Sequence, residues 1–199
     1  MYVDGFNLYY GALRGRQYKW LDLLAFSHCL LRPTNTVTRI RYFTAELLPS
    51  TRDPAAPERQ QAYLRALETT PNLSIHYGSF LQSPGQPPRE KGSDVNLASY
   101  LLLDAFDSAY EVALVITNDS DLTHPIELVR ERFGVRVGVA APVLNRHPDG
   151  KRRYPSRDLR HAADFLVPIN RRRRYLLRDS QLPDAIVHGG RTITRPSGW

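Results

Sequence analysis

The 199-residue chain is poor in the features that mark secreted, disulfide-bonded or membrane proteins. It has one cysteine, Cys29, which excludes an intramolecular disulfide and a multi-cysteine zinc site. No run of about 18 apolar residues is present, so no membrane span is expected. A basic start followed by an apolar stretch is also missing, which argues against a secretory signal. We therefore expect a cytoplasmic protein, with Cys29 as a small buried residue of an apolar helix.

Motifs for covalent catalysis and for nucleotide binding by a glycine-rich loop are missing too. The 6 histidines are scattered without metal-ligand spacing, and neither a Ser-His-Asp nor a Cys-His arrangement is visible. The sequence holds no P-loop and no GxGxxG motif. A mechanism through a covalent protein nucleophile is therefore disfavoured.

Positive charge is concentrated in one part of the chain. Residues 1–145 hold 14 Lys/Arg against 15 Asp/Glu, whereas residues 146–178 hold 11 Lys/Arg against 3 Asp, and the chain as a whole carries +7. The basic segment includes K-R-R at 151–153 and R-R-R-R at 171–174. Such clustering is typical of a surface that binds a polyanion, although a solvated surface gives the same pattern.

Apolar segments of strand and helix character alternate along the chain, which predicts a parallel sheet with helices on both faces. Strands are expected at 2–4, 36–45, 74–81, 111–117, 135–141 and 165–169, and helices at 19–31, 57–69, 93–109, 121–132, 158–163 and 170–178. The first strand is short, so residues upstream of Met1 are expected to complete it. The Pro/Gly-rich stretch 83–92 is expected to be an irregular, mobile loop that ends at Ser93 as the helix N-cap. Residues 179–199 are expected to form an extended tail that packs on the body or wraps a second copy in a homodimer.

Acidic residues occur at three points where this pattern places element ends. They are Asp4 in V-D-G-F-N-L, Asp94 in E-K-G-S-D-V-N, and Asp119 and Asp121 in V-I-T-N-D-S-D-L. The carboxyl ends of parallel strands face one crevice, where ligands bind. Carboxylates that converge there repel one another unless a divalent cation lies between them. This layout is expected of an Mg²⁺- or Mn²⁺-dependent enzyme acting on phosphate esters.

Each of these residues also has a purely structural interpretation. Asp4 precedes Gly5, and this pair is common in turns. Asp94 lies in a first helical turn, where the helix dipole stabilises a carboxylate. Asp119, or Ser120 in its place, is a candidate helix N-cap. The argument for chemistry therefore depends on the three motifs together.

The three motifs in this order resemble the NYN domain, a branch of the PIN-like nuclease superfamily that includes LabA/DUF88-like bacterial proteins. The resemblance covers residues 1–169 and implies a three-layer α/β/α sandwich around a mainly parallel sheet of five to six strands. Residues 170–199 then form a basic C-terminal helix and an extended tail. T-N-D-S-D-L departs from the more common S-G-D-S-D-F of the family, but Asn tolerates the left-handed backbone that Gly adopts.

The resemblance implies a metal-dependent nuclease with a named set of site residues. Asp4, Asp94, Asp119 and Asp121 are the expected metal ligands, and Asn7 completes the catalytic set by orienting a metal-bound water or holding Asp4. Single-stranded RNA is the favoured nucleic-acid partner, and its expected contacts are Lys91, Arg152, Arg153, Arg171 and Arg172. Two alternatives stay open, a non-catalytic nucleic-acid-binding module and a metal-dependent phosphatase of small molecules.

Overall fold

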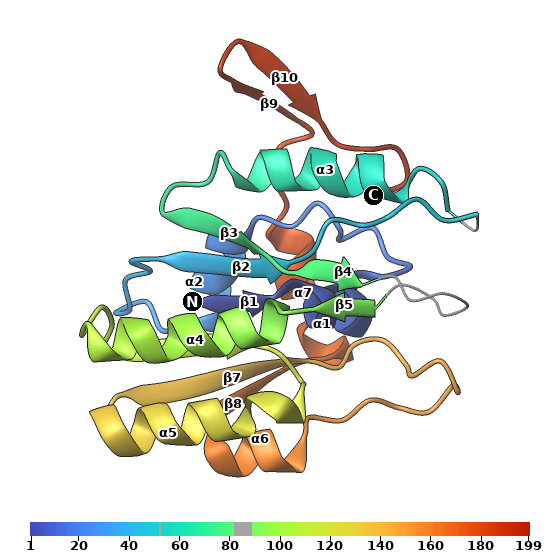
Figure 1. Ribbon diagram of the computed structural model, residues 1–199. Coiled ribbons are helices and arrows are strands. Elements are labelled where there is room, and N and C mark those ends of the chain that lie inside the picture. Colours follow the sequence, from blue (N-terminus) through green and yellow to red (C-terminus); the bar gives the residue numbers. More distant parts are fainter. Residues whose placement is uncertain (52, 82–88) are drawn as a thin grey trace.

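The computed structural model describes residues 1–51, 53–81 and 89–199, which fold around a six-stranded sheet (Figure 1). The strand order is β3-β2-β1-β6-β7-β8, and every neighbouring pair is parallel. The strands are β1 (Tyr2–Asp4), β2 (Ile40–Thr44), β3 (Leu73–Tyr77), β6 (Val112–Ile116), β7 (Arg136–Pro142) and β8 (Phe165–Ile169). The predicted parallel sheet of five to six strands is confirmed, and the short strand β1 lies at its centre.

Helices cover both faces of the sheet and complete the predicted three-layer sandwich. One face packs against α4 (Ser93–Phe106), α5 (Thr123–Phe133) and α6 (Arg157–Ala162). The other packs against α1 (Gly5–Leu8), the π-helical turn η1 (Tyr9–Leu13), α2 (Leu23–Leu30), α3 (Ala56–Leu67) and α7 (Arg174–Asp179). Two 3₁₀ turns, η2 (Ser120–Leu122) and η3 (Arg171–Arg173), precede α5 and α7.

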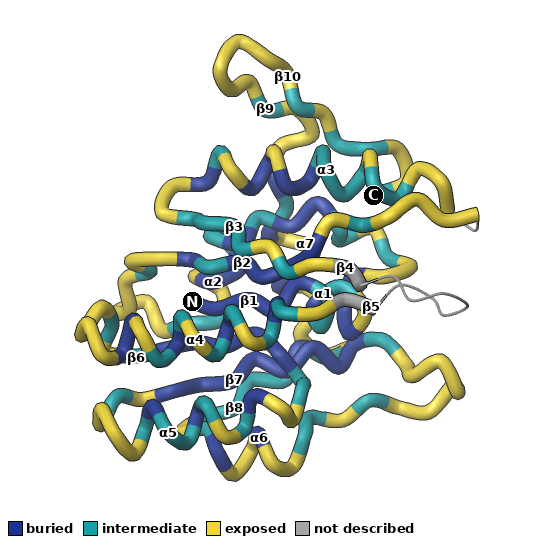
Figure 2. Tube along the Cα trace, in the orientation of Figure 1, coloured by how far each residue is buried: buried dark blue, intermediate teal, exposed yellow. Residues whose placement is uncertain are grey.

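The alternation of side chains along each strand explains the two apolar cores. In β6, Leu114 and Ile116 join one core, while Ala113 and Val115 join the core on the opposite face. All four are buried, as expected of a continuous apolar run in a strand that is covered on both faces. Figure 2 shows the buried residues gathered along the central strands and on the inner sides of the helices.

The first helical region differs from its predicted boundaries. The helix expected at 19–31 begins at Leu23, because Asp22 caps it by accepting hydrogen bonds from the backbone N–H groups of Leu24 (2.9 Å) and Ala25 (3.0 Å). The helical turns α1 and η1, directly after β1, were not predicted. Asp4 caps α1 in the same way, so the turn that D-G suggested is the start of a helix.

A second difference concerns the stretch 83–92, which was expected to be irregular. Its residues 83–88 lie outside the described residues, but β5 (Arg89–Lys91) pairs antiparallel with β4 (Ser79–Leu81). The strand predicted at 74–81 is therefore divided at Gly78 into β3, which belongs to the main sheet, and β4, which belongs to this hairpin. Pairing between two short strands leaves no periodic signal in a stretch rich in Pro and Gly.

The prediction for Cys29 was wrong. Leu23 and Phe26 occupy the core face of α2, whereas Cys29 lies one turn later on the exposed side. Its Sγ is 3.6 Å from the hydroxyl oxygen of Ser180, at the end of α7. The apolar residues around it extend over more of the helix than the core covers, so the sequence pattern alone did not show which side faces solvent.

The C-terminal tail packs on the body and also forms a hairpin that was not predicted. Strands β9 (Ala185–His188) and β10 (Arg191–Thr194) are antiparallel and extend from the α3 end of the molecule (Figure 1). Trp199 then returns to pack on Trp20 and Tyr63, with ring centroids 6.5 and 5.8 Å away. No helix within the described part of the chain is both long and apolar enough to cross a bilayer.

Candidate active site

Asp4 lies at the carboxyl end of the central strand and is almost fully buried, with 4% of its surface exposed. Its carboxylate accepts two hydrogen bonds, from the Asn7 backbone N–H (2.9 Å) and from the Thr117 hydroxyl (3.0 Å). Thr117 directly follows β6, the neighbour of β1 in the sheet. Residues that are 113 positions apart are thus joined because β1 and β6 are parallel neighbours that end at the same edge of the sheet.

Gly5, directly after Asp4, is required by the close packing at this point. A Cβ atom there would lie 2.7 Å from the Tyr42 hydroxyl oxygen and 2.8 Å from the Phe43 carbonyl oxygen. Both are far below a normal van der Waals contact, so a larger residue would push β2 away from β1. Tyr42 had no signal in the sequence beyond its place in an alternating strand.

Asn7 connects the first motif to the third. Its side-chain oxygen accepts a hydrogen bond from the Asn118 backbone N–H at 3.1 Å. Asn118 in turn accepts from the Ser156 N–H (2.8 Å) and donates to the Tyr154 carbonyl (3.1 Å). Asn7 therefore fixes the loop after β6, and Asn118 ties the basic loop between β7 and α6 to the same place.

Asp119 and Asp121 follow β6 but occupy different environments. Asp119 is partly buried and caps the 3₁₀ turn η2, because its carboxylate accepts the Asp121 N–H at 3.1 Å. Its own N–H donates to the Thr117 hydroxyl oxygen at 3.1 Å, so Thr117 contacts both Asp4 and Asp119. Asp121 is exposed. The expected cap is therefore Asp119 and not Ser120.

Asp94 lies in the first turn of α4, as predicted, although the cap before it is different. Gly92 is the N-cap, with a φ of 97° that favours glycine, and Ser93 is buried as the first helical residue. The left-handed residue turns the chain from β5 into the helix. Asp94 is only partly buried, and its charge acts on Asp4 across the crevice.

The pKa of Asp4 is strongly raised, chiefly because its carboxyl group is buried. Burial raises the pKa of Asp4 to about 7, with repulsion from Asp94 and Asp119 adding to the rise and the hydrogen bonds from Asn7 and Thr117 opposing it. A carboxyl group that titrates near neutral pH is a frequent mark of a functional site.

The chemistry of this donor set fits a hard divalent cation. Carboxylate oxygens are the ligands that Mg²⁺ and Mn²⁺ prefer, and a cation would offset the repulsion at Asp4. Within the residues that the structure describes, no group of three or more His, Cys, Asp or Glu side chains could enclose a metal ion by itself. Mg²⁺ usually takes one or two carboxylates and keeps water or phosphate oxygens on its other positions. The open arrangement of Asp4, Asp94 and Asp119 fits that mode of binding.

The basic residues expected to contact substrate lie on three segments around this edge of the sheet (Figure 1). Lys91 ends β5 and is exposed, and it lies three residues before Asp94. Arg152 and Arg153 lie in the loop after β7 that Asn118 holds. Arg171 and Arg172 are exposed on η3 after β8, the edge strand two places from β6.

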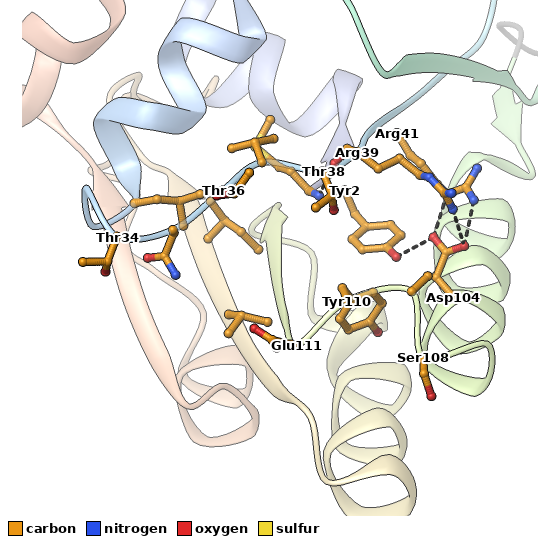
Figure 3. A pocket seen from close by; sticks show the side chains of 17 residues that line it. Tyr2, Thr34, Thr36, Thr38, Arg39, Arg41, Asp104, Ser108, Tyr110 and Glu111 are labelled. Carbon is orange, nitrogen blue, oxygen red and sulfur yellow. Dashed lines mark hydrogen bonds and ion pairs between the residues drawn. The ribbon is translucent and has the colours of Figure 1, made fainter.

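A second polar cluster lies in a cleft of about 460 Å³ at the opposite, amino-terminal edge of the sheet (Figure 3). Asp104 of α4 is buried there and accepts hydrogen bonds from the Tyr2 hydroxyl (2.6 Å) and from two Arg41 nitrogens (both 2.7 Å). Burial alone would raise the pKa of Asp104, but the hydrogen bonds from Arg41 and Tyr2 hold that pKa below its usual value. No sequence pattern predicted this cluster, because it joins three elements that are far apart in the chain.

Comparisons with known proteins agree with the fold and with the three motifs. The chain is 28% identical to the 6-hydroxy-3-succinoylpyridine 3-monooxygenase HspA of Pseudomonas putida (strain DSM 28022 / S16), an alignment that covers 100% of this chain and 74% of that protein. A crystal structure of a protein of unknown function from Vibrio parahaemolyticus matches with a TM-score of 0.57 and 18% identity, over 85% of this chain and 91% of that one. The family model of the NYN domain matches residues 1–170. With that match over most of its length, and with the parallel sheet and clustered aspartates described above, the chain belongs to the NYN domain family.

Proposed function

We propose that this protein is a metal-dependent nuclease that hydrolyses phosphodiester bonds of single-stranded RNA at the carboxyl edge of β1 and β6. The NYN family is a family of PIN-like nucleases, which act on nucleic acids and typically use divalent metals. The observation that carries the proposal is the buried Asp4, whose pKa is raised to about 7 by burial and by the nearby Asp94 and Asp119. A bound cation would offset the repulsion between these carboxylates and could bind a phosphate of the substrate on its open side.

In this proposal the aspartates hold Mg²⁺ or Mn²⁺. One or two of Asp4, Asp94 and Asp119 bind the metal directly, and the remaining carboxylates, among them the more exposed Asp121, contribute through water. The bound metal lowers the pKa of a water molecule and stabilises negative charge on the phosphate. Thr117 and Asn7 keep Asp4 and the loop after β6 in place through the hydrogen bonds described above, so the site does not depend on flexible side chains alone.

The basic residues bind the backbone of the RNA strand. Arg153 is partly buried, and its Nε, shielded from solvent, has no hydrogen-bond partner within the described residues. A phosphate would contact Arg153 through the terminal nitrogens of its guanidinium group. Lys91 and Arg152 extend this surface, and Arg171 and Arg172 continue it along the strand. Residues 1–169 form the catalytic unit in this proposal, and residues 170–199 add basic charge and a packed tail.

The test is cleavage of a fluorescently labelled single-stranded RNA by the purified full chain in Mn²⁺ or Mg²⁺. Asp119→Asn keeps a capping residue on η2 but removes the charge, so it should abolish cleavage without unfolding the protein. Asp107→Asn, at the exposed end of α4, is the matched control and should cleave as the wild type does. Full activity in Asp119→Asn would refute the assignment of the site.

The same assay separates the alternatives. Binding of RNA without metal-dependent cleavage would favour a non-catalytic module of the same fold. Hydrolysis of nucleoside monophosphates but not of RNA would favour a small-molecule phosphatase. Labelled single-stranded DNA in a parallel reaction decides whether the sugar is recognised, because RNA and DNA differ at the 2′-hydroxyl.

A hydroxylase is a second candidate, favoured by the 28% identity with a 3-monooxygenase over the whole chain. A monooxygenase needs O₂ and two electrons from a reductant, so it would consume O₂ and NADH when given a hydroxypyridine substrate and a flavin reductase. Such consumption, retained in Asp119→Asn while no RNA is cleaved, would replace the nuclease proposal.

A further inference from the structure

A small pocket lined by aromatic side chains opens beside the candidate active site. It lies between α1, η1, β2, α3 and the C-terminal residue, and its volume is about 140 Å³. Its aromatic lining consists of Phe6, Tyr9, Tyr10, Tyr42, Tyr63 and Trp199. Neither the proposed metal ligands nor the expected RNA contacts are part of this lining, so the pocket has no role in the site as described so far.

The volume of the pocket limits what it can hold. A cavity of about 150 Å³ accommodates benzene, whereas drug-sized ligands occupy about 300–1,000 Å³. A pocket of about 140 Å³ therefore fits one aromatic ring and not a whole nucleotide. The remainder of any larger ligand must lie outside, along the protein surface.

The aromatic side chains are arranged to stack against such a ring. Phe6 and Tyr10 are nearly parallel, with centroids 6.4 Å apart and an interplanar angle of 18°. Tyr9 meets Tyr10 edge-on at 5.2 Å. Tyr10 keeps 43% of its surface exposed, and the Arg14 guanidinium lies over its ring, 5.4 Å from the centroid. A base that stacks on this face of Tyr10 would take the place of Arg14.

The pocket is joined directly to the catalytic edge. Gly5 and Phe6, the two residues after Asp4, line it. Tyr42 also lines the pocket, its hydroxyl group lies close to Gly5, and no hydrogen bond connects that hydroxyl to another described residue. A ring in the pocket would thus lie next to Asp4 and could accept a hydrogen bond from Tyr42.

Positive charge lies at the rim of the pocket. Lys19 is partly buried and donates to the Gly198 carbonyl at 3.0 Å, and Arg59 forms an ion pair with Asp53. Among these side chains the charge of Arg59 is paired with that of Asp53, which leaves the positive charge of Lys19 at the rim. This combination suits a flat ring that carries an anionic substituent.

We propose that this pocket holds a pyrimidine base of the substrate strand, next to the phosphate that is cleaved, with the phosphate of that nucleotide against Lys19 and Arg59. The proposal rests on the proposed nuclease function and adds a preference for single-ring bases. Tyr10 supplies the stacking surface, and Lys19 supplies the charge.

The test measures binding of UMP, AMP and ribose 5-phosphate to the full chain in EDTA, through the intrinsic fluorescence of Trp20 and Trp199. UMP should bind more tightly than AMP and ribose 5-phosphate. Tyr10→Ala should weaken UMP binding by between about 5-fold and about 150-fold, the range expected for loss of one base–aromatic stack. Phe106→Ala, an exposed aromatic residue at the far end of α4, is the control and should change nothing. Lys19→Gln should weaken binding of UMP but not of uridine.

Unchanged UMP binding in Tyr10→Ala, or equal affinity for AMP and UMP, would overturn the base pocket. Because these titrations contain no metal and no cleavage, they do not depend on the nuclease assay. Full cleavage activity in Asp119→Asn would refute the nuclease site but would not affect UMP binding to the pocket. Failure of the nuclease proposal can therefore be distinguished from failure of the base pocket. Tighter binding of a pyridine carboxylate than of UMP would assign the pocket to a free aromatic acid and overturn its role in an RNA strand.

Discussion

Asp4 makes the stability of the metal-free protein depend on pH in an unusual direction. An unfolded aspartate titrates near 3.8, whereas burial raises the pKa of Asp4 to about 7 in the folded state. Between these values the folded state binds more protons than the unfolded state. Its stability therefore falls as pH rises through this window, by about 1.4 kcal/mol per pH unit and about 4 kcal/mol in total.

The Asp4→Asn variant removes this penalty at a small structural cost. The Asn oxygen can accept from the Asn7 N–H, and its amide nitrogen can donate to the Thr117 hydroxyl oxygen, so the cap on α1 is kept. Rearranging these hydrogen bonds should cost about 1 kcal/mol. In EDTA at pH 8 the variant should thus be about 3 kcal/mol more stable than the wild type. At pH 4 this advantage should vanish or reverse by up to about 1 kcal/mol.

Urea denaturation followed by circular dichroism at pH 4, 6 and 8 measures this difference. Mg²⁺ at about 100 times its Kd should stabilise the wild type by about 2.7 kcal/mol and the variant much less. Asp107→Asn, which changes an exposed carboxylate, controls for the loss of one negative charge. A stability difference between wild type and Asp4→Asn that stays constant from pH 4 to pH 8 would refute the reasoning.

Two further predictions concern other charged residues. Asp104→Asn leaves Arg41 without its buried charged partner, so it should lower the free energy of unfolding by about 3–5 kcal/mol. Asp149 forms an exposed pair with Lys151, so Asp149→Asn should change that free energy by less than about 1 kcal/mol. Urea denaturation measures both values. Equal effects would mean that the Asp104 pair contributes no more than a surface pair. Neutralising Arg171 and Arg172 to Gln should lower the slope of log K against log salt for single-stranded RNA by about 1.4, and an unchanged slope would remove η3 from the interface.

The sequence by itself determined the order and type of the main elements. Strand β6 was predictable because V-A-L-V-I is apolar at every position, as expected of a short strand that is covered on both faces. The convergence of Asp4 with Asp119 followed from the rule that parallel strands end at one edge, and the family followed from three motifs in order. These features depend on hydrophobic periodicity and on the order of strands and helices, and both can be recognised in the amino-acid sequence.

Tertiary packing decided the features that depend on contacts between distant residues. The exposure of Cys29 depends on how far α7 covers α2, and the pairing of β4 with β5 depends on two short segments meeting. The raised pKa of Asp4 reflects how completely β2, β6 and α1 enclose it, and the aromatic pocket exists only because Trp199 returns to the side of α3. The burial of a side chain and its distance to other side chains depend on residues tens of positions away in the sequence. A local sequence pattern therefore cannot predict them.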